Sequence, residues 1–223
     1  MKLLFFIIFT TMFTFANAYS VVGTVENYKG NVKIKSETSV KKNKVKSNLQ
    51  IKSGDMIVTS QNAFVQIKLN DNSNIVLGES SSIIFSSINN VEQSSGKVFY
   101  KISSRDAKNS LKIKTPFAII GVKGTTFIVN ASEESSVILK EGLINIRSIN
   151  DEFELVKQEI IDEFAFDKKA IIDEFNNFKE DDKILEFDLQ PLKSVSFDGN
   201  TVIEQAWSLK NDAEFKYFNN LLN

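Results

Sequence analysis

The side chains that could carry out chemistry in this sequence are almost all acidic or basic, because the two most versatile reactive residue types are absent. The 223 residues include no cysteine and no histidine. Disulfides, thiol catalysis and iron–sulfur ligation by cysteine are therefore excluded. The commonest general base and the commonest zinc ligand are missing as well. We therefore predict that the protein is not an enzyme and uses no cofactor or metal.

Carboxylate pairs are the strongest remaining candidates for acid–base catalysis. Three adjacent pairs lie in the last third of the chain: Asp162 and Glu163, Asp173 and Glu174, and Asp181 and Asp182. Two carboxyl groups can act as general acid and base when they converge on one bond. Adjacent residues do not share one face of a helix. We therefore interpret these pairs as a solvated acidic surface.

A glycine-containing segment, residues 121–126, has some features of a phosphate-binding loop. In a Walker loop the lysine follows the second glycine, and a helix comes next. Here Lys123 precedes Gly124, and a β-branched, aromatic stretch follows. The pattern therefore favours turn glycines between two core strands.

Two polar clusters suggest ligands but fit structural roles better. Residues 70–74 are rich in calcium-type oxygen ligands, yet Ile75 breaks the alternation that an EF-type loop needs. We interpret them as a turn. The lysine cluster at residues 41–46 has no interleaved aromatic residues for base stacking. It is typical of an exposed edge or loop, and we expect no nucleic-acid partner.

Short strands are the elements that must position these residues. Leu111 and Ile113 alternate with Lys112 and Lys114, which is the period of a half-buried strand. Pro116 cannot donate to a sheet ladder, so pairing should stop or shift there. Similar strands recur every 8–12 residues with turn residues between them. We predict a mainly β protein with a compact all-β domain of short stacked strands over residues 19–149, a sandwich or short solenoid.

Three motifs in this region resemble those of FecR-type domains. The run Thr115-Pro116-x-Ala118-x-x-Gly121-Val122-Lys123-Gly124-Thr125-x-Phe127 is similar to the family pattern T-P-x-A-x-x-x-V-R-G-T-x-F. Lys123 stands where the family usually has arginine. Upstream, Gly54-Asp55-x-Ile57-x-Thr59 is similar to G-D-x-I-x-T, and Asn72 replaces the usual glycine of a following D-G-S turn. Downstream, Val137-x-Leu139-x-Glu141-Gly142-x-Ile144-x-Ile146 is similar to the family's closing strands.

The resemblance implies a compact all-β fold and a set of motif residues. We expect these to be structural first: Gly54, Asp55, Thr115, Pro116, Gly121, Lys123, Gly124, Thr125, Phe127 and Gly142. It also implies envelope signalling, because FecR proteins relay an outer-membrane transport signal to a cytoplasmic sigma factor. Those regulators have a cytoplasmic part and a membrane span before the periplasmic region, whereas this sequence opens with a secretory signal. We therefore expect it to act by binding another envelope protein.

Residues 1–18 are typical of a secretory signal peptide. A lysine at position 2 precedes an apolar run, and Ala16-Asn17-Ala18 is a small-x-small cleavage site. The apolar run is shorter than the roughly 20 residues that a transmembrane helix needs. We predict cleavage after Ala18, a periplasmic location and no transmembrane helix in the mature chain. An uncleaved anchor is the alternative.

The chain changes character near residue 150. Residues 1–150 carry 19 Lys and Arg against 10 Asp and Glu, a net charge of +9, whereas residues 151–223 carry 8 against 18, a net charge of −10. From residue 153 onward, apolar positions recur at helical spacing, and Ile160–Phe164 is echoed eleven residues later. We predict an acidic, mostly helical region over 150–223. It would comprise one or two amphipathic helices from Asp151 to about Lys183, a hairpin at residues 198–200 and a closing helix over 213–222.

These observations favour a non-catalytic protein–protein recognition or signalling module of the bacterial envelope. Its partner would be an envelope protein that the sequence does not identify. The alternative is a structural envelope protein that self-associates through residues 151–183. A small-ligand binder or enzyme is disfavoured by the missing histidine and cysteine. The opposed charges have two interpretations: two separate solvated surfaces of opposite charge, or an acidic region that lies against the basic domain.

Overall fold

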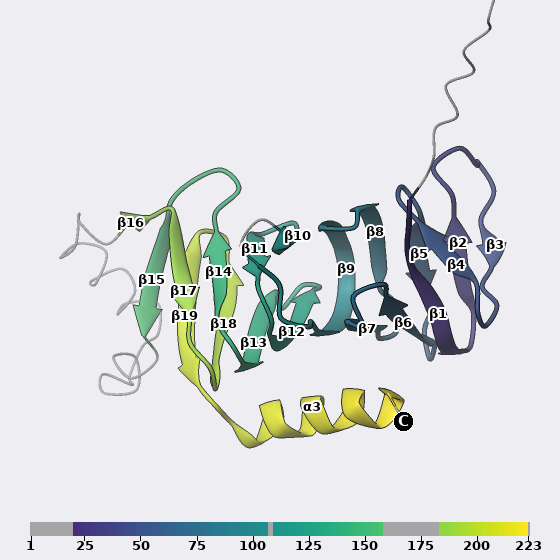
Figure 1. The fold of residues 1–223 in the computed structure, drawn as a ribbon. Coiled ribbons are helices and arrows are strands. Elements are labelled where there is room, and N and C mark those ends of the chain that lie inside the picture. Colours follow the sequence, from purple (N-terminus) through teal and green to yellow (C-terminus); the bar gives the residue numbers. More distant parts are fainter. Residues whose placement is uncertain (1–19, 107–108, 158–182, 223) are drawn as a thin grey trace, which may run out of the picture.

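The computed structural model describes residues 20–106, 109–157 and 183–222. Regular structure in this part of the chain is β, apart from a single helix near the C-terminal end (Figure 1). The predicted mainly β fold class is therefore confirmed, and so is the closing helix. The strands form two sheets, which we call sheet A and sheet B.

Sheet A is antiparallel except between its strands β19 and β15. Its strands in spatial order are β4 (Gln50–Lys52), β1 (Val21–Lys29), β6 (Phe64–Leu69), β7 (Asn74–Leu77), β9 (Asn90–Lys101), β12 (Thr126–Ala131), β13 (Ser136–Glu141), β18 (Lys193–Asp198), β19 (Thr201–Ala206), β15 (Phe153–Lys157) and β16 (Lys183–Ile184).

Sheet B is antiparallel except between β9 and β10. Its strands in spatial order are β3 (Asn43–Lys44), β2 (Val32–Lys35), β5 (Met56–Thr59), β8 (Ser82–Ser87), β9, β10 (Leu111–Lys114), β11 (Ile119–Val122), β14 (Ile144–Arg147) and β17 (Glu186–Leu189).

Strand β9 belongs to both sheets, and a glycine marks the change. Its first half pairs with β8 in sheet B, and its second half pairs with β7 and β12 in sheet A. Between the halves, Gly96 has a φ of 77°, which side-chain-bearing residues rarely adopt. A Cβ at this position would also collide with Ser81. The crossing therefore needs glycine.

The main core lies between the two sheets. Along most of the longer strands, inward-pointing residues are buried as the period-2 pattern predicts, for example Ile67 in sheet A and Ile57 in sheet B. The ring of Tyr100 stacks on Phe127 at a centroid distance of 5.0 Å. Its hydroxyl donates to Gln93 Oε1 at 2.9 Å. Burial raises the pKa of Tyr100, so this phenol stays neutral and fixed in the core.

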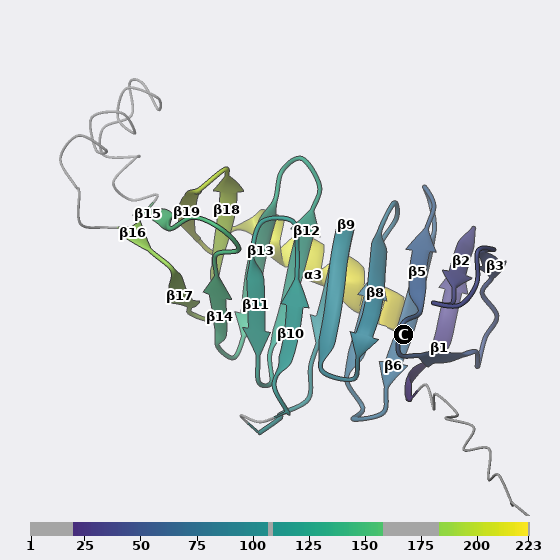
Figure 2. The same cartoon turned by 90° about the horizontal axis from the view of Figure 1, so that it is seen from above.

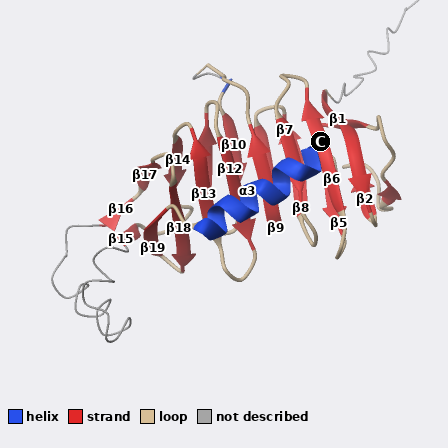
Figure 3. Cartoon of the chain, turned by 90° about the horizontal axis from the view of Figure 1, so that it is seen from below, coloured by secondary structure: helices blue, strands red, loops and turns tan. Residues whose placement is uncertain are grey.

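A second apolar cluster lies on the outer face of sheet A, under helix α3 (Leu209–Leu222; Figure 3). Phe215 and Phe218 are spaced so that both face the sheet. The Phe218 ring stacks on Phe99 at 5.7 Å, and the Phe215 ring meets the same residue edge-on at 5.9 Å. Lys97 forms an ion pair with Glu214 at 2.8 Å. These contacts fix α3 across the middle of sheet A.

The helix predicted from residue 151 is wrong at its beginning. Phe153–Lys157 form strand β15, which pairs in parallel with β19. Apolar residues at helical spacing can also serve a strand when tertiary pairing is available, and here the pairing decides. The rest of that predicted helix, over residues 158–182, lies outside the described residues. The predicted hairpin is confirmed, because β18 and β19 are antiparallel and Gly199 has a φ of 59°.

Strands from both sides of residues 149 and 150, the predicted domain boundary, share the two sheets. Strand β13 pairs with β18, and β14 pairs with β17. Among the described residues, no helix has both the length and the apolar character that crossing a bilayer requires.

Candidate functional site

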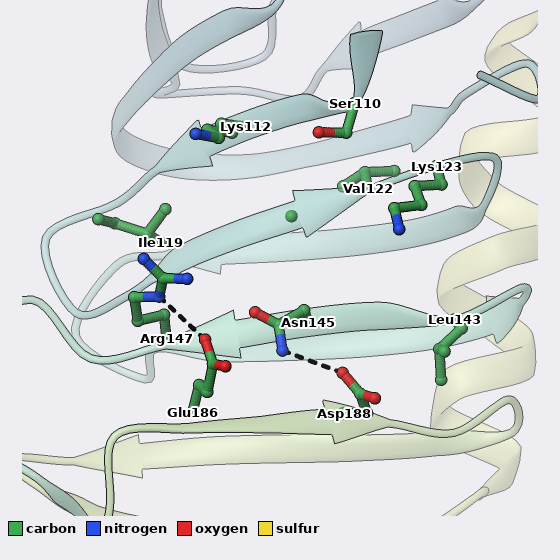
Figure 4. Close-up of a pocket in the computed structure, with 11 residues that line it drawn as sticks. Ser110, Lys112, Ile119, Val122, Lys123, Leu143, Asn145, Arg147, Glu186 and Asp188 are labelled. Atoms are coloured by element: carbon green, nitrogen blue, oxygen red, sulfur yellow. Dashed lines mark hydrogen bonds and ion pairs between the residues drawn. The ribbon is translucent and has the colours of Figure 1, made fainter. Parts of the chain in front are cut away.

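An open groove crosses the outer face of sheet B at strands β10, β11, β14 and β17 (Figure 4). Its volume is about 480 Å³. The residues that line it are Ser110, Lys112, Ile119, Gly121, Val122, Lys123, Leu143, Asn145, Arg147, Glu186 and Asp188.

The strand register explains why a groove forms here. Lys112, Gly121, Asn145 and Asp188 are successive neighbours in one row across the four strands. Residues of one row project from the same face of a sheet. Because the second member of this row has no side chain, the row is interrupted at β11, and the backbone of that strand forms the floor.

Gly121 differs from the other motif glycines, because the local backbone does not require it. A Cβ at this position would meet no atom closer than 3.8 Å, the carbonyl oxygen of Asn145, which is an ordinary contact. Gly54, Gly124 and Gly142 instead have φ values of 86°, 134° and 90°, and an added Cβ would lie within 3 Å of a neighbour at each. The fold therefore needs those three glycines, whereas Gly121 keeps the groove open.

The two walls of the groove carry opposite charges. Lys112 and Lys123 are exposed on the side of β10 and β11. On the other side, β17 contributes two carboxylates that are held by β14 (Figure 4). Arg147 Nε donates to Glu186 Oε2 at 3.0 Å, and Asn145 Nδ2 donates to Asp188 Oδ1 at 3.0 Å. Such exposed pairs stabilise little, but they fix the directions of charged groups that a partner could contact.

The groove is therefore equipped for binding by hydrogen bonds and ion pairs. Among the described residues that line it, Ser110 carries the single hydroxyl group, and the sequence has no histidine that could activate it. Among the residues that the structure describes, no group of three or more His, Cys, Asp or Glu side chains could hold a metal ion.

Comparison with family models places a known domain around this groove. Residues 55–145 match the model FecR, described as FecR protein. Because of this match we refer to residues 55–145 as the FecR domain. It contains Lys112, Gly121 and Lys123 of the groove, whereas Arg147, Glu186 and Asp188 lie beyond its C-terminal limit. No match was found among curated proteins.

Two solved structures are similar in fold. The crystal structure, at 1.65 Å, of a proposed anti-sigma factor from Parabacteroides distasonis ATCC 8503 aligns with a TM-score of 0.50 and 14% identity. The alignment covers 72% of this chain and 63% of that chain, so this chain spans less than two thirds of its length. A second structure with the same description, at 2.50 Å, gives a TM-score of 0.48 and 15% identity and covers 70% and 61% of the two chains.

Most motif residues of the FecR domain lie away from the groove and support turns or the core. Asp55 is buried, and its carboxylate accepts the Lys52 N–H at 2.8 Å. Thr115 is buried beside the exposed Pro116, and its hydroxyl donates to the Ala118 carbonyl at 2.8 Å, which closes the turn into β11. The backbone of Thr125 forms hydrogen bonds in both directions with that of Ile102, the residue that follows β9. Phe127 packs in the main core, as described above.

Only Gly121 and Lys123 of the predicted motif residues line the groove. Lys112 is not among the site residues predicted from the sequence, although its alternation with apolar neighbours places it on an outward face. Asn145 and Asp188 were not predicted either, and their side chains meet although they are 43 positions apart. No local pattern indicates that β17 returns to lie beside β14.

Proposed function

We propose that this protein is a non-catalytic recognition module of the bacterial envelope that binds a partner protein in the groove of sheet B. The observation that carries the proposal concerns Gly121. The local backbone would accept a larger residue at this position, yet glycine there keeps the floor of the groove open. The FecR domain around it supports a role in envelope signalling. The signal-like residues 1–18 support export to the periplasm.

The shape and charge of the groove favour a protein partner over a small ligand. Small-molecule sites are typically enclosed and mostly apolar. This groove is open to solvent and has charged residues on both walls. Complementary charge arrangements of this kind give protein interfaces their orientation and specificity.

Site-specific crosslinking in cells tests the proposal. A photoreactive amino acid would replace Leu143, which is 48% exposed at the groove, and in a control it would replace Tyr217, which is 53% exposed on α3. We expect a specific envelope protein to be captured from position 143 and not from position 217. Adding Gly121→Phe should abolish this capture by filling the floor, whereas Gly121→Ala should leave most of it.

A charge variant provides a second, independent test. Lys112→Glu should reduce capture, while the matched control Lys33→Glu, an exposed lysine at the far end of the same sheet, should not. Equal capture by all variants would contradict the proposal. Capture of further copies of this chain alone would instead support the alternative, an envelope protein that self-associates through residues 151–183.

A further inference from the structure

The two sheets do not end together at the C-terminal end of the molecule. Beyond the shared strand β9, sheet A continues through β12, β13, β18, β19, β15 and β16. Sheet B continues only through β10, β11, β14 and β17. Strands β15 and β16 form the outermost end of the described fold (Figures 1 and 2). Within the described residues, sheet A therefore extends two strands further than sheet B.

Within the described part of the chain, β17 is the last strand of sheet B at this end. Among the described strands it pairs only with β14. The Ser148 N–H donates to the Leu185 carbonyl at 2.9 Å, which fixes the phase of this antiparallel ladder. In an antiparallel ladder, hydrogen-bonded and non-hydrogen-bonded residue pairs alternate along each strand. Because Leu185 is in a hydrogen-bonded pair, Phe187 and Leu189 also direct their N–H and C=O groups toward β14. Glu186 and Asp188 direct their N–H and C=O groups away from β14, where a further strand would pair.

Some apolar side chains of the main core next to this edge are still partly exposed to solvent. Leu155, Ile184 and Phe187 pack against the main core but are only partly buried. By contrast Leu189, at the other end of β17, is fully buried. A strand added beside β17 would lie over the overhanging part of sheet A. Its inward side chains would cover these apolar groups and remove their surface from water.

The outward side of β17 specifies the charge of such a strand. Glu186 and Asp188 are both exposed, on the face that forms the acidic wall of the groove. Opposite charges on neighbouring strands stabilise pairing, and like charges directly opposite destabilise it. Two copies of β17 would place carboxylates against carboxylates. The edge therefore disfavours self-pairing and favours a strand with basic outward residues.

We propose that an extended segment of a partner protein, with apolar residues alternating with Lys or Arg, adds to β17 as the next strand of sheet B. This rests on the proposed function and names how the partner binds the same face. Main-chain hydrogen bonds to Glu186 and Asp188 supply affinity, as in other cases of strand addition. Inward apolar residues and outward basic residues supply the selectivity.

A synthetic peptide with the alternating pattern Leu-Lys-Ile-Lys-Val-Lys tests this with the full chain. Hydrogen exchange followed by NMR should show the amides of Glu186 and Asp188 slowed about tenfold or more at saturating peptide, because they become hydrogen-bonded. The amides of Phe187 and Leu189 should change little, since β14 already holds them. A peptide with glutamate in place of lysine should bind about fivefold more weakly or worse.

Two variants test the edge of β17, and because both also change the acidic wall of the groove, crosslinking from position 143 is measured in each. Asp188→Pro removes the outward N–H without removing a bond to β14, and edge strands tolerate such a proline. It should abolish peptide binding. Should this variant fail to fold, the double substitution Glu186→Lys and Asp188→Lys keeps the backbone and should reverse the preference toward the glutamate peptide.

The outcomes distinguish this inference from the proposed function. Unchanged exchange at residues 186 and 188, or no discrimination between the two peptides, overturns strand addition. If Asp188→Pro loses peptide binding while the control Asp198→Asn keeps it, the edge site is supported. Continued crosslinking from position 143 in Asp188→Pro, together with failure of every peptide test, would leave the groove function standing and remove the strand-addition model.

Discussion

At the residue scale, a charged pair outside the groove fixes the segment between β9 and β10. The Arg105 side chain is 7% exposed, and its Nε donates to Asp71 Oδ2 at 2.6 Å. Asp71 also accepts the Ser73 N–H at 3.0 Å and the Ser73 hydroxyl at 2.9 Å. Arg105 contacts the Asn89 side chain at 3.3 Å as well. Arg105 thus links the turn at residues 71–73 to Asn89 and holds three segments of the chain together.

This pair predicts a loss of stability in acid. Burial acts to raise the pKa of Asp71, but the hydrogen bonds from Ser73 and the charge of Arg105 outweigh it and hold that pKa below its usual value. A carboxyl group with a lowered folded pKa stabilises the protein above its unfolded pKa of about 3.9. That contribution should be lost as the pH falls from about 4 through the lowered folded value.

The variant Asp71→Asn should therefore lose about 1.5–3 kcal/mol of unfolding free energy at pH 7, the usual worth of hydrogen bonds to charged groups. Its deficit relative to the parent protein should shrink by pH 3. Urea unfolding at both pH values measures this difference in unfolding free energy. The control is Asp198→Asn, a substitution of an exposed residue in the hairpin. A deficit of equal size at pH 7 and pH 3 would show that the charge of Asp71 is not what stabilises this contact.

At the element scale, α3 is held to sheet A by few side chains. Phe215 and Phe218 are each 1% exposed, whereas Tyr217 between them is 53% exposed. Phe218→Ala should therefore cost about 3 kcal/mol, at the lower end of the range for buried phenylalanines because a terminal helix can shift to fill space. Tyr217→Ala should cost less than about 0.5 kcal/mol. Thermal or urea unfolding compares the two.

Hydrogen exchange along α3 adds a local measurement to the same comparison. In Phe218→Ala the amides of α3 should exchange faster than those of β12 and β13, because the helix undocks before the sheets open. Equal acceleration in α3 and in the sheets would indicate that helix and sheets unfold as one unit.

The strands of the FecR domain could be predicted, whereas the elements after residue 149 could only partly be predicted. Alternation such as that of Leu111 to Lys114 is local, and so is the turn chemistry around Gly199. Both predictions are confirmed by the structure. Phe153 and Val156 fit both a helix and a strand by spacing alone, and the pairing with β19 about 50 positions later decides between them. For the same reason the position of β17 could not be predicted, because no residue near Glu186 in the sequence indicates its contact with Arg147.

At the scale of the whole molecule, contacts join the basic and acidic parts of the chain. Arg147 pairs with Glu186 at 3.0 Å, and Lys97 pairs with Glu214 at 2.8 Å. Both pairs are partly exposed and contribute modestly to stability. The larger connection is through backbone pairing, since β17 and β18 supply the neighbours of β14 and β13. The hypothesis that the acidic region lies against the basic domain thus gains support from the described residues.

This connection predicts how truncations behave. Removing residues 151–223 would leave β13 and β14 as open edges and expose the fully buried Ile144, Ile146 and Leu139. Exposure of buried apolar side chains costs roughly 1.5–3 kcal/mol each, so the loss should approach the whole stability of an ordinary domain. The chain ending at Asn150 should therefore unfold or aggregate under conditions in which the full chain is folded.

Removing only residues 209–223 is the matched control, because it deletes α3 and keeps both sheets. This shorter deletion should lower the unfolding midpoint but leave a cooperative transition, measured by circular dichroism during urea titration. If the chain ending at Asn150 instead folds with the stability of the full chain, the predicted boundary at residues 149 and 150 separates two independent units. In that case β17 and β18 would be an addition to a complete domain, and the edge beside Glu186 would belong to the addition alone.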